Sequence, residues 1–595
     1  MKILTLGGIT LVAALVAAAL PASVQAQGSR EYFLAHITQN DAPRQLSDAD
    51  ATYYRSLFRA IHSERWPEVQ RLLGERSAGP LHSVALAEYY LHARSPRVEL
   101  GQIATWLETG RDLPMASQLA RLGLTRGLEA APELPLENPF RSVGSFPRRV
   151  RPSSIEDTTM PGSIANGITS AITNDDPDGA LQLLIGIESG LSPEARAEWR
   201  TRVAWSYFIE NRDADALLLA RTVSQDSGPW VAEGEWTRGL AAWRLNDCEE
   251  AGAAFQRSAV MAENVELRAA ALYWASRAAL RCRQPQDASR LLAEATGEDQ
   301  TLYGMLATEQ LGRNMPDRVS RAEVSAADWQ TIGNSANIRT AVALAEIGED
   351  DLASEVLLHQ ARIGDPAHYA ALSRLARDLG MPQTQLYMAY NAPDGGRADP
   401  ASFYPTPRWT PLNGWRVDPA LAYAHILQES NFRAGARSPA NAQGLMQITP
   451  ITVRQHAPRL ELGPDAVDIY EPRTNLAFGQ RNLEMLQEDP ATHDQLPKIM
   501  AAYNAGLTPV RRWETEIRDF GDPLLYMEAI PYWETRSYVA IVMRNYWMYE
   551  RQARTLSPSR LSLAQNEFPA FPDADPGTDS SDDRVFLSTE PTNGD

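Results

Sequence analysis

One glutamate in this chain, Glu429, has the setting expected of a general acid. It falls in the last turn of a short helix that begins with Asp418, an N-cap candidate, and Pro419, which suits the first helical position. The negative end of the helix dipole disfavours another negative charge there, and Ile426 adds an apolar neighbour one turn earlier. Both effects raise the pKa of the carboxyl, so it can donate a proton near neutrality.

The segment after this helix has the composition of a binding loop. Ser438-Pro439 favours a turn, and Gly444 lets the backbone come close to another group. The run Gly444-Leu445-Met446-Gln447 then offers backbone donors, an amide and a flexible apolar side chain. A glutamate at a helix end is usually a solvated surface residue, so the loop matters only in combination with Glu429 at this spacing.

Two further motifs follow in order: Ala501-Ala502-Tyr503-Asn504-Ala505-Gly506, and Glu528-Ala529-Ile530-Pro531 with Glu534-Thr535-Arg536-Ser537-Tyr538-Val539. Together with the Glu429 segment they resemble the lysozyme-like lytic transglycosylases of the soluble, Slt type. Thr449 departs from this pattern, because the family often has methionine there. The resemblance is strong from about Phe403 to Arg554 and only architectural before that.

The resemblance implies an enzyme that cleaves the β-1,4 bond between MurNAc and GlcNAc in peptidoglycan without water. Glu429 would protonate the glycosidic oxygen, and the substrate's own N-acetyl oxygen would support the cation at C1. Glu429 would then take the proton of the C6 hydroxyl, which closes a 1,6-anhydro ring. The implied substrate-binding residues are Ser438, Gln443, Met446, Gln447, Tyr503, Asn504, Glu528 and Tyr538.

The distribution of carboxylates bears on this mechanism. Most glycosidases use two carboxyl groups, but no Asp or Glu occurs between Glu429 and Glu461. Two alternatives stay open: a muramidase of the same fold, which would need a second carboxylate such as Glu528, and a non-catalytic tetratricopeptide-like scaffold. His425, one turn before Glu429, is expected to be a packed or surface histidine.

The first residues have the form of a secretory signal peptide. Lys2 precedes an apolar run to Leu20, and Val24-Gln25-Ala26 is a small-x-small cleavage site. No cysteine follows the site to carry a lipid, and no later segment resembles a membrane span. We therefore expect a periplasmic, soluble protein that is not a lipoprotein.

The chain of 595 residues is too long for a single core. Its apolar spacing predicts an all-α fold: tetratricopeptide-like hairpins, with a period in the mid-thirties of residues, form a superhelix ahead of a lysozyme-like, mainly helical domain. The predicted parts are a signal peptide (1–26), a superhelical domain (27–395, with a sub-boundary near 132–163), a linker (396–415), a catalytic SLT domain (403–555) and an acidic disordered tail (556–595).

Charge and composition limit the classes of ligand and partner that we expect. A formal net charge of −19 argues against nucleic-acid binding. No H-E-x-x-H motif or phosphate-binding glycine loop occurs, so we expect neither a metal nor another cofactor. The expected partners are peptidoglycan glycan strands, with transient contacts to the outer membrane or other cell-wall enzymes as a further option.

Cys248 and Cys282 are the chain's two cysteines. They fall in or beside the loops of adjacent predicted hairpins, on the same edge of the superhelix. Two cysteines in an exported chain favour a disulfide, which predicts that the two Cα atoms lie within about 7 Å.

Overall fold

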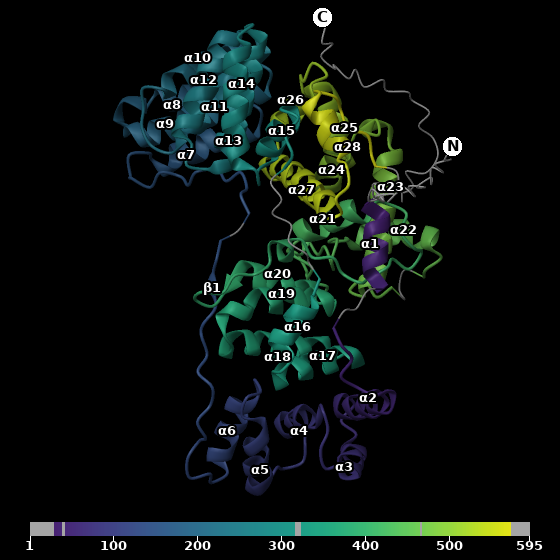
Figure 1. Cartoon of the computed structure of the whole chain (residues 1–595). Coiled ribbons are helices and arrows are strands. Elements are labelled where there is room, and N and C mark those ends of the chain that lie inside the picture. Colours follow the sequence, from purple (N-terminus) through teal and green to yellow (C-terminus); the bar gives the residue numbers. More distant parts are fainter. Residues whose placement is uncertain (1–28, 39–41, 145, 316–322, 464–466, 573–595) are drawn as a thin grey trace, which may run out of the picture.

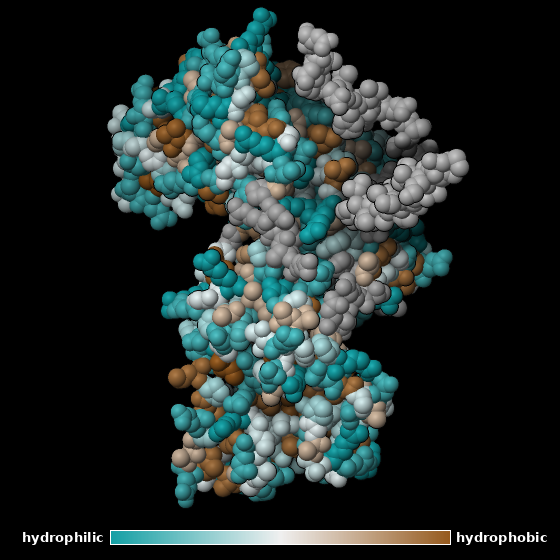
Figure 2. Space-filling view, viewed as in Figure 1, coloured by the Kyte–Doolittle hydropathy of each residue, from teal (hydrophilic) through white to brown (hydrophobic). Residues whose placement is uncertain are grey.

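The fold is almost wholly helical, as the spacing of the apolar residues predicts. The computed structural model describes residues 29–38, 42–144, 146–315, 323–463 and 467–572 (Figure 1). Within these ranges no helix is both long and apolar enough to cross a membrane. The predicted signal peptide, Met1 to Ala26, lies outside the described residues. The visible surface is mostly hydrophilic, with apolar side chains in small scattered groups (Figure 2).

A first helical block, at the bottom and middle of Figure 1, joins two stretches that are distant in sequence. Their buried apolar side chains form one core. The carboxylate of Glu346 also links them, because it accepts hydrogen bonds from the backbone N–H groups of Gln45 (2.6 Å) and Leu46 (3.0 Å). The helices are α2 (Asp48–His62), α3 (Trp66–Glu75), α4 (His82–Leu91), α5 (Leu100–Gly110), α6 (Ala116–Thr125), α16 (Ala326–Ile332), α17 (Ala336–Ile347), α18 (Asp350–Ile363), α19 (Tyr369–Asp378) and α20 (Pro382–Tyr390).

The Pro-rich stretch after α6 connects this block to the next one. It runs along one side of the molecule in Figure 1. On the way, β1 (Arg141–Ser142) pairs antiparallel with β2 (Asn391–Ala392). The predicted superhelical range, 27–395, therefore contains helices that belong to two different cores.

The second block, the hairpin block, contains the predicted helical hairpins. Each of three hairpin loops has one residue in the left-handed conformation at an equivalent position: Asn211 (φ 58°), Asn246 (φ 62°) and Arg283 (φ 60°). This recurrence is the structural counterpart of the sequence period. The helices are α7 (Gly162–Thr173), α8 (Pro177–Ile185), α9 (Pro193–Ile209), α10 (Asp213–Val223), α11 (Trp230–Arg244), α12 (Cys248–Met261), α13 (Val265–Arg281), α14 (Pro285–Ala295) and α15 (Leu302–Gln310).

The C-terminal unit, green to yellow in Figure 1, packs against this second block, and the two share one continuous hydrophobic core. Its helices are α21 (Pro419–Glu429), α22 (Pro450–His456), α23 (Pro472–Glu488), α24 (Leu496–Ala505), α25 (Leu507–Glu516), α26 (Pro523–Ala529), α27 (Trp533–Gln552) and α28 (Pro558–Ala564). The stretch 396–415, predicted as a linker, contributes the buried side chains of Tyr404 and Trp415 to this core.

The first described helix, α1 (Ser29–Thr38), lies against the C-terminal unit rather than within the superhelix. The Ser29 hydroxyl donates to Asp418 Oδ1 at 2.7 Å. The buried ring of Phe33 meets Tyr423 edge to face at 5.4 Å between centroids. An element near the N-terminus therefore packs on the helix that ends at Glu429.

The prediction of a disordered tail from 556 onward is wrong for residues 557–572. Leu563 of α28 is fully buried, and Phe571 is buried as well. The backbone N–H of Leu496 donates to the Pro569 carbonyl at 2.8 Å. The acidic composition that suggested disorder belongs mainly to residues 573–595, outside the described ranges, whereas the earlier residues retain enough apolar side chains to pack.

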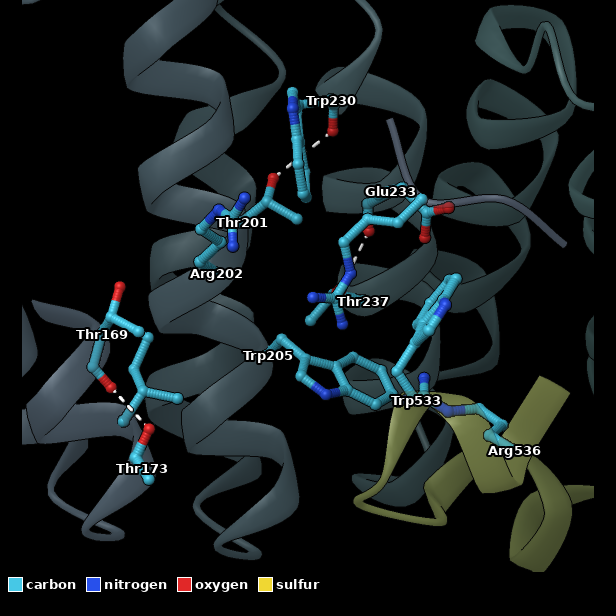
Figure 3. Close-up of a pocket in the computed structure, with 12 residues that line it drawn as sticks. Thr169, Thr173, Thr201, Arg202, Trp205, Trp230, Glu233, Thr237, Trp533 and Arg536 are labelled. Atoms are coloured by element: carbon cyan, nitrogen blue, oxygen red, sulfur yellow. Dashed lines mark hydrogen bonds between the residues drawn. The ribbon is translucent and has the colours of Figure 1, made fainter. Parts of the chain in front are cut away.

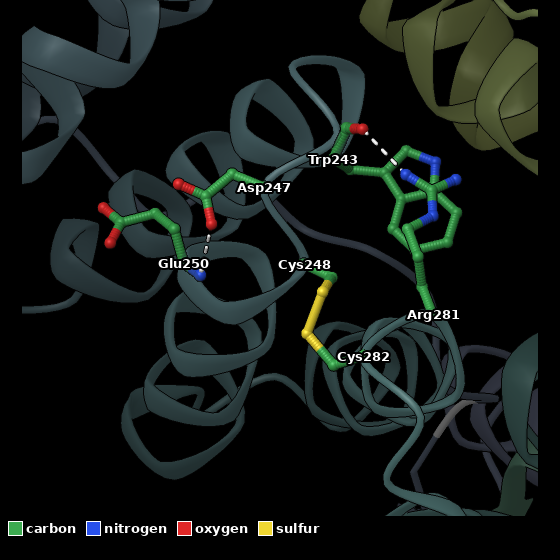
Figure 4. The surroundings of a disulfide bond; sticks show 6 residues. All are labelled: Trp243, Asp247, Cys248, Glu250, Arg281 and Cys282. Carbon is green, nitrogen blue, oxygen red and sulfur yellow. Dashed lines mark hydrogen bonds between the residues drawn. A yellow bond between two sulfur atoms is a disulfide. The ribbon is translucent and has the colours of Figure 1, made fainter.

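A disulfide joins Cys248, at the start of α12, to Cys282, directly after α13 (Figure 4). The two Cα atoms are 5.6 Å apart. Because the cysteines are 34 residues apart in sequence, the bond ties two neighbouring hairpins together at one edge of the block. Its main physical effect is to restrict the unfolded chain.

We expect the double substitution Cys248→Ser with Cys282→Ser to lower the free energy of unfolding of this block by about 3–4 kcal/mol, from the entropy of a closed loop of this length. Hydrogen exchange of the α12 and α13 amides before and after the change measures the loss. Reducing the unsubstituted protein should give the same loss. Two free thiols, found by labelling denatured and unreduced protein, would contradict the bond.

Candidate active site

Helix α21 places Glu429 as the sequence predicts. Asp418 caps its start and accepts a hydrogen bond from the Ala420 N–H at 2.9 Å, with Pro419 in the first position. The helix ends at Glu429, which lies half-buried beside α27. The Tyr538 hydroxyl, from α27, donates to Glu429 Oε1 at 2.7 Å. This hydrogen bond therefore holds the Glu429 carboxyl, at the end of α21, against α27.

The surroundings of Glu429 favour its protonated form. Burial raises the pKa of Glu429 to about 7, against the lowering effect of the Tyr538 hydrogen bond, and the nearby negative charge of Glu534 raises it further. Burial also raises the pKa of Tyr538 well above its usual value, so the phenol remains a donor. A carboxyl with this pKa can give up a proton and take one back near neutrality.

The loop after α21 forms a tight hairpin. Ser438 and Ala442 close its tip: the Ser438 N–H donates to the Ala442 carbonyl at 2.9 Å, and the Ala442 N–H donates to Ser438 Oγ at 3.0 Å. Gln443 pairs with Arg437 below this tip and also begins a second turn, in which Gln443 and Ile448 exchange two backbone hydrogen bonds of 3.0 and 2.9 Å. Ser438 thus shapes the tip of the first turn, and the backbone of Gln443 belongs to both turns.

Asn475, on α23, holds this hairpin and was not among the residues singled out from the sequence. Its amide accepts from the Met446 N–H (2.7 Å) and donates to the carbonyls of Gln443 (3.0 Å) and Ile469 (2.8 Å). Gly444 makes this approach possible: its φ is +76°, and a Cβ atom there would lie 2.1 Å from Asn475 Nδ2. A lone asparagine within a helical pattern gives no sequence signal for this role.

Met446 differs from the expectation of a substrate-facing side chain. It is fully buried, and its sulfur packs so close to Gly479 that a Cβ on that glycine would lie 2.0 Å from Sδ. Its carbonyl instead accepts a hydrogen bond from the Tyr503 hydroxyl at 2.8 Å. Next to it, Gln447 has a positive φ of 50°, and its amide donates to the Gly444 carbonyl at 2.9 Å.

Tyr503 and Tyr538 line the site with stacked rings, 6.4 Å apart at an interplanar angle of 9°. The His425 ring lies 4.7 Å from Tyr503 and 6.0 Å from Tyr538. His425 is fully buried, and burial lowers its pKa to about 3, so the ring is uncharged at neutral pH. His425 is therefore a packed histidine, in line with the sequence expectation.

Asn504 lies in the last turn of α24. Its Oδ1 accepts a hydrogen bond from the Thr535 hydroxyl of α27 at 2.7 Å. Because Oδ1 is occupied by Thr535, the orientation of the amide is fixed, and its NH₂ group points away from that contact. The helix stops at Gly506, whose φ of 85° suits glycine, as the motif predicts.

Glu528 is turned toward the hairpin block. Its Oε1 accepts a hydrogen bond from the Tyr303 hydroxyl of α15 at 2.7 Å, and Arg149 Nη1 lies 3.7 Å from its Oε2. Tyr303 in turn accepts from Trp274 Nε1 at 3.1 Å, and Arg149 pairs with Glu233 at 2.8 Å. Both carboxylate oxygens of Glu528 therefore have partners outside the C-terminal unit.

The second carboxylate that acts electrostatically on Glu429 is Glu534, an exposed residue in the first turn of α27. The sequence motif contained Glu534 but gave it no role. Glu534 and Glu429 are far apart in sequence, so the sequence alone did not indicate that they are close. They come together because α27 packs across α21. In the described ranges, no group of three or more His, Cys, Asp or Glu side chains is placed to hold a metal ion.

The match to a known protein family falls in the C-terminal unit. Residues 411–524 match the family model "Transglycosylase SLT domain". This segment is a transglycosylase SLT domain. It contains Glu429, the hairpin of Ser438 to Ile448, and Tyr503, whereas Glu528 and Tyr538 lie beyond the matched residues of the SLT domain.

Curated relatives match around the SLT domain. The putative soluble lytic murein transglycosylase of Haemophilus influenzae is 33% identical over 142 residues, which are 23% of each chain. The soluble lytic murein transglycosylase of Escherichia coli is 30% identical over 156 residues, 26% of this chain and 24% of the relative. The aligned stretch thus spans about a quarter of the curated relatives.

Solved structures extend the likeness in fold to most of the chain. A complex of the 70-kDa soluble lytic transglycosylase with bulgecin A is similar over 86% of this chain and 98% of that one, with a TM-score of 0.56 and 17% identity. An inactive mutant of lytic transglycosylase Slt from Pseudomonas aeruginosa is similar over 85% and 87%, with a TM-score of 0.50 and 19% identity. The helical blocks and the SLT domain therefore follow the fold of soluble lytic transglycosylases.

The hydrogen bond from Tyr538 to Glu429 predicts a shift in pH dependence. Tyr538→Phe removes a donor that favours the ionised carboxylate, so the pKa of Glu429 should rise above about 7. We expect the alkaline limb of the pH profile of kcat/KM, or the carboxyl titration followed by NMR, to move to higher pH. A limb that stays in place would mean that Tyr538 does not act on the charge of Glu429.

Proposed function

We propose that this protein is a lytic transglycosylase that cleaves the β-1,4 bond between MurNAc and GlcNAc in peptidoglycan and leaves 1,6-anhydro-MurNAc ends. The observation that carries the proposal is the state of Glu429: a carboxyl of the SLT domain with a pKa of about 7, which accepts a hydrogen bond from Tyr538 of the following helix α27. Export through the predicted signal peptide would deliver the enzyme to the periplasm, where cell-wall turnover takes place.

In this mechanism Glu429 acts twice. Its proton passes to the glycosidic oxygen, and the C1–O bond breaks as the N-acetyl oxygen of the substrate supports the cation. The resulting carboxylate accepts the proton of the C6 hydroxyl, and O6 bonds to C1. Glu429 ends protonated, as it began, and water does not take part. A pKa near neutrality suits both steps, because neither proton transfer is strongly uphill.

The other residues of the site would support these steps. Tyr538 holds the carboxyl and stabilises the anion formed after the first transfer. The hairpin from Ser438 to Ile448 and the residues Tyr503 and Asn504 are proposed to bind the sugars. Glu528, given a substrate-binding role from the resemblance, is better explained as a link to the hairpin block through Tyr303.

The alternative function is that of a muramidase, since Glu534 is a second carboxylate near Glu429, which a hydrolase would need. Water would then attack C1, and the products would have ordinary reducing ends. An anhydro end is about 18 Da lighter than such an end, because water never adds. Mass spectrometry of the products separates the two reactions directly.

We expect Glu429→Gln to keep the fold and to lower activity on purified sacculi by several orders of magnitude, since acid and base roles are each worth roughly 10²–10⁴-fold. Glu534→Gln is the matched control, with the same change of charge nearby. It should retain most activity and lower the pKa of Glu429. Reducing ends that carry solvent oxygen-18, together with loss of activity in Glu534→Gln, would favour the muramidase.

A further inference from the structure

Helix α1 meets the C-terminal unit at the start of α21, the helix that carries Glu429 at its other end. The Ser29 hydroxyl donates to Asp418, the N-cap of α21, at 2.7 Å, although the two residues are 389 positions apart in sequence. Arg30 Nη2 donates to the carbonyl of Trp415, just before the cap, at 3.3 Å. A helix near the N-terminus therefore anchors the end of α21 that lies opposite Glu429.

The ring of Phe33, on α1, contacts side chains of both α21 and α27. Its side chain is 1% exposed. The ring meets Tyr423 of α21 at 5.4 Å and Tyr549 of α27 at 6.1 Å between centroids, both edge to face. Aromatic pairs in this arrangement favour a defined relative orientation. Phe33 therefore helps to set how α21 lies on α27.

Helix α27 is also held from its other side, by the hairpin block. At its start Arg536 lies over the ring of Trp205 of α9 at 4.1 Å, and Figure 3 shows Trp205 and Trp533 at the same cavity. Further along α27, Arg544 Nη1 lies 3.6 Å from Oε1 of Glu266 on α13. The main helix contacts of α21, in contrast, are with α1, α23 and α27. Loss of the α1 contacts would therefore displace α21 rather than α27.

The geometry at Glu429 is sensitive to a small displacement of this kind. A helix with its side chains has a radius of about 5–6 Å, so a rotation of α21 by about 10° moves the Glu429 carboxyl by about 1 Å. The hydrogen bond from Tyr538 to Glu429 is 2.7 Å long, and O–H···O bonds extend to only about 3.0 Å. Such a rotation breaks this bond, but it is too small to unpack the helix or to expose the carboxyl.

We infer that α1 is a positioning element for the reaction: Phe33 and Ser29 hold the start of α21 so that the Glu429 carboxyl stays aligned with Tyr538. The inference rests on the proposed function and adds positioning residues from the N-terminal part of the chain to it. Phe33 belongs to the core that the hairpin block and the C-terminal unit share, whereas other residues form the core of the first helical block. The alignment of Glu429 is therefore separable from the stability of the first block.

The full-length protein with Phe33→Ala tests this role. Since a misplacement of about 1 Å costs up to about 10²-fold in rate, we expect kcat on soluble peptidoglycan strands to fall roughly 10- to 100-fold, with KM little changed. Tyr538 lowers the pKa of Glu429 by more than Glu534 raises it, so loss of the Tyr538 bond should raise this pKa. The alkaline limb of the pH profile of kcat/KM should then move to higher pH. NMR titration of the Glu429 carboxyl measures the same shift without turnover.

Combination with Tyr538→Phe distinguishes positioning from general damage. If Phe33 acts through the Tyr538 hydrogen bond, Phe33→Ala should add no further shift of the alkaline limb to protein that already has Tyr538→Phe. Phe33→Leu keeps an apolar side chain and should retain more of kcat than Phe33→Ala. Ser29→Ala should shift the limb in the same direction by a smaller amount. These two milder variants decide the question if Phe33→Ala does not fold.

Phe58→Ala is the matched control, because Phe58 is also a buried phenylalanine near the N-terminus but packs in the core of the first helical block. It should destabilise that block and leave kcat and the alkaline limb in place. An unshifted limb in Phe33→Ala, additive shifts in the double variant, or an equal fall of kcat in Phe58→Ala would overturn the positioning role. Failure of the proposed function would appear separately, as absence of anhydro products from the unsubstituted enzyme, and the NMR titration would still report the alignment of Glu429.

Discussion

The burial of helix α27 on several sides is the constraint on which the rest of this structure depends. One of its faces presents Tyr538 to Glu429, and another carries Arg536 toward the hairpin block. Further along α27, Arg544 Nη1 lies 3.6 Å from Oε1 of Glu266 on α13. A polar side chain buried at such an interface needs a specific partner, so the pairs Tyr538 with Glu429 and Arg544 with Glu266 fix α27 with respect to both neighbours at once. The geometry of Glu429 is therefore coupled to the packing of the hairpin block.

A second fixed point lies at the other end of the catalytic helix. The carboxylate of Asp418 accepts hydrogen bonds from Ala420 N (2.9 Å), Ser29 Oγ (2.7 Å) and the Tyr546 hydroxyl (2.9 Å). Burial raises the pKa of Asp418, while these three donors oppose the rise. One N-cap thus joins α1, α21 and α27, and the start and the end of α21 are both tied to α27.

Electrostatics distinguishes Glu429 from the other carboxylates of this acidic chain. With a net charge of −19, most carboxylates are solvated or paired, but the half-buried Glu429 has a pKa raised to about 7 and remains partly protonated near neutrality. At the joint between the hairpin block and α27, Arg151 and Arg536 make no ion pair within the described ranges, although Glu233 also lines this joint.

The sequence by itself determined the local structure of this protein. The cap at Asp418, the position of Glu429 at a helix end, the stop at Gly506 and the hairpin period all follow from spacing and residue type, which act over a few residues. Only the tertiary structure decided which distant side chains meet. It buried Met446, turned Glu528 toward Tyr303, brought Glu534 near Glu429, and used Asn475 to hold the hairpin. These contacts depend on how helices cross, and residue spacing along one chain does not encode a crossing.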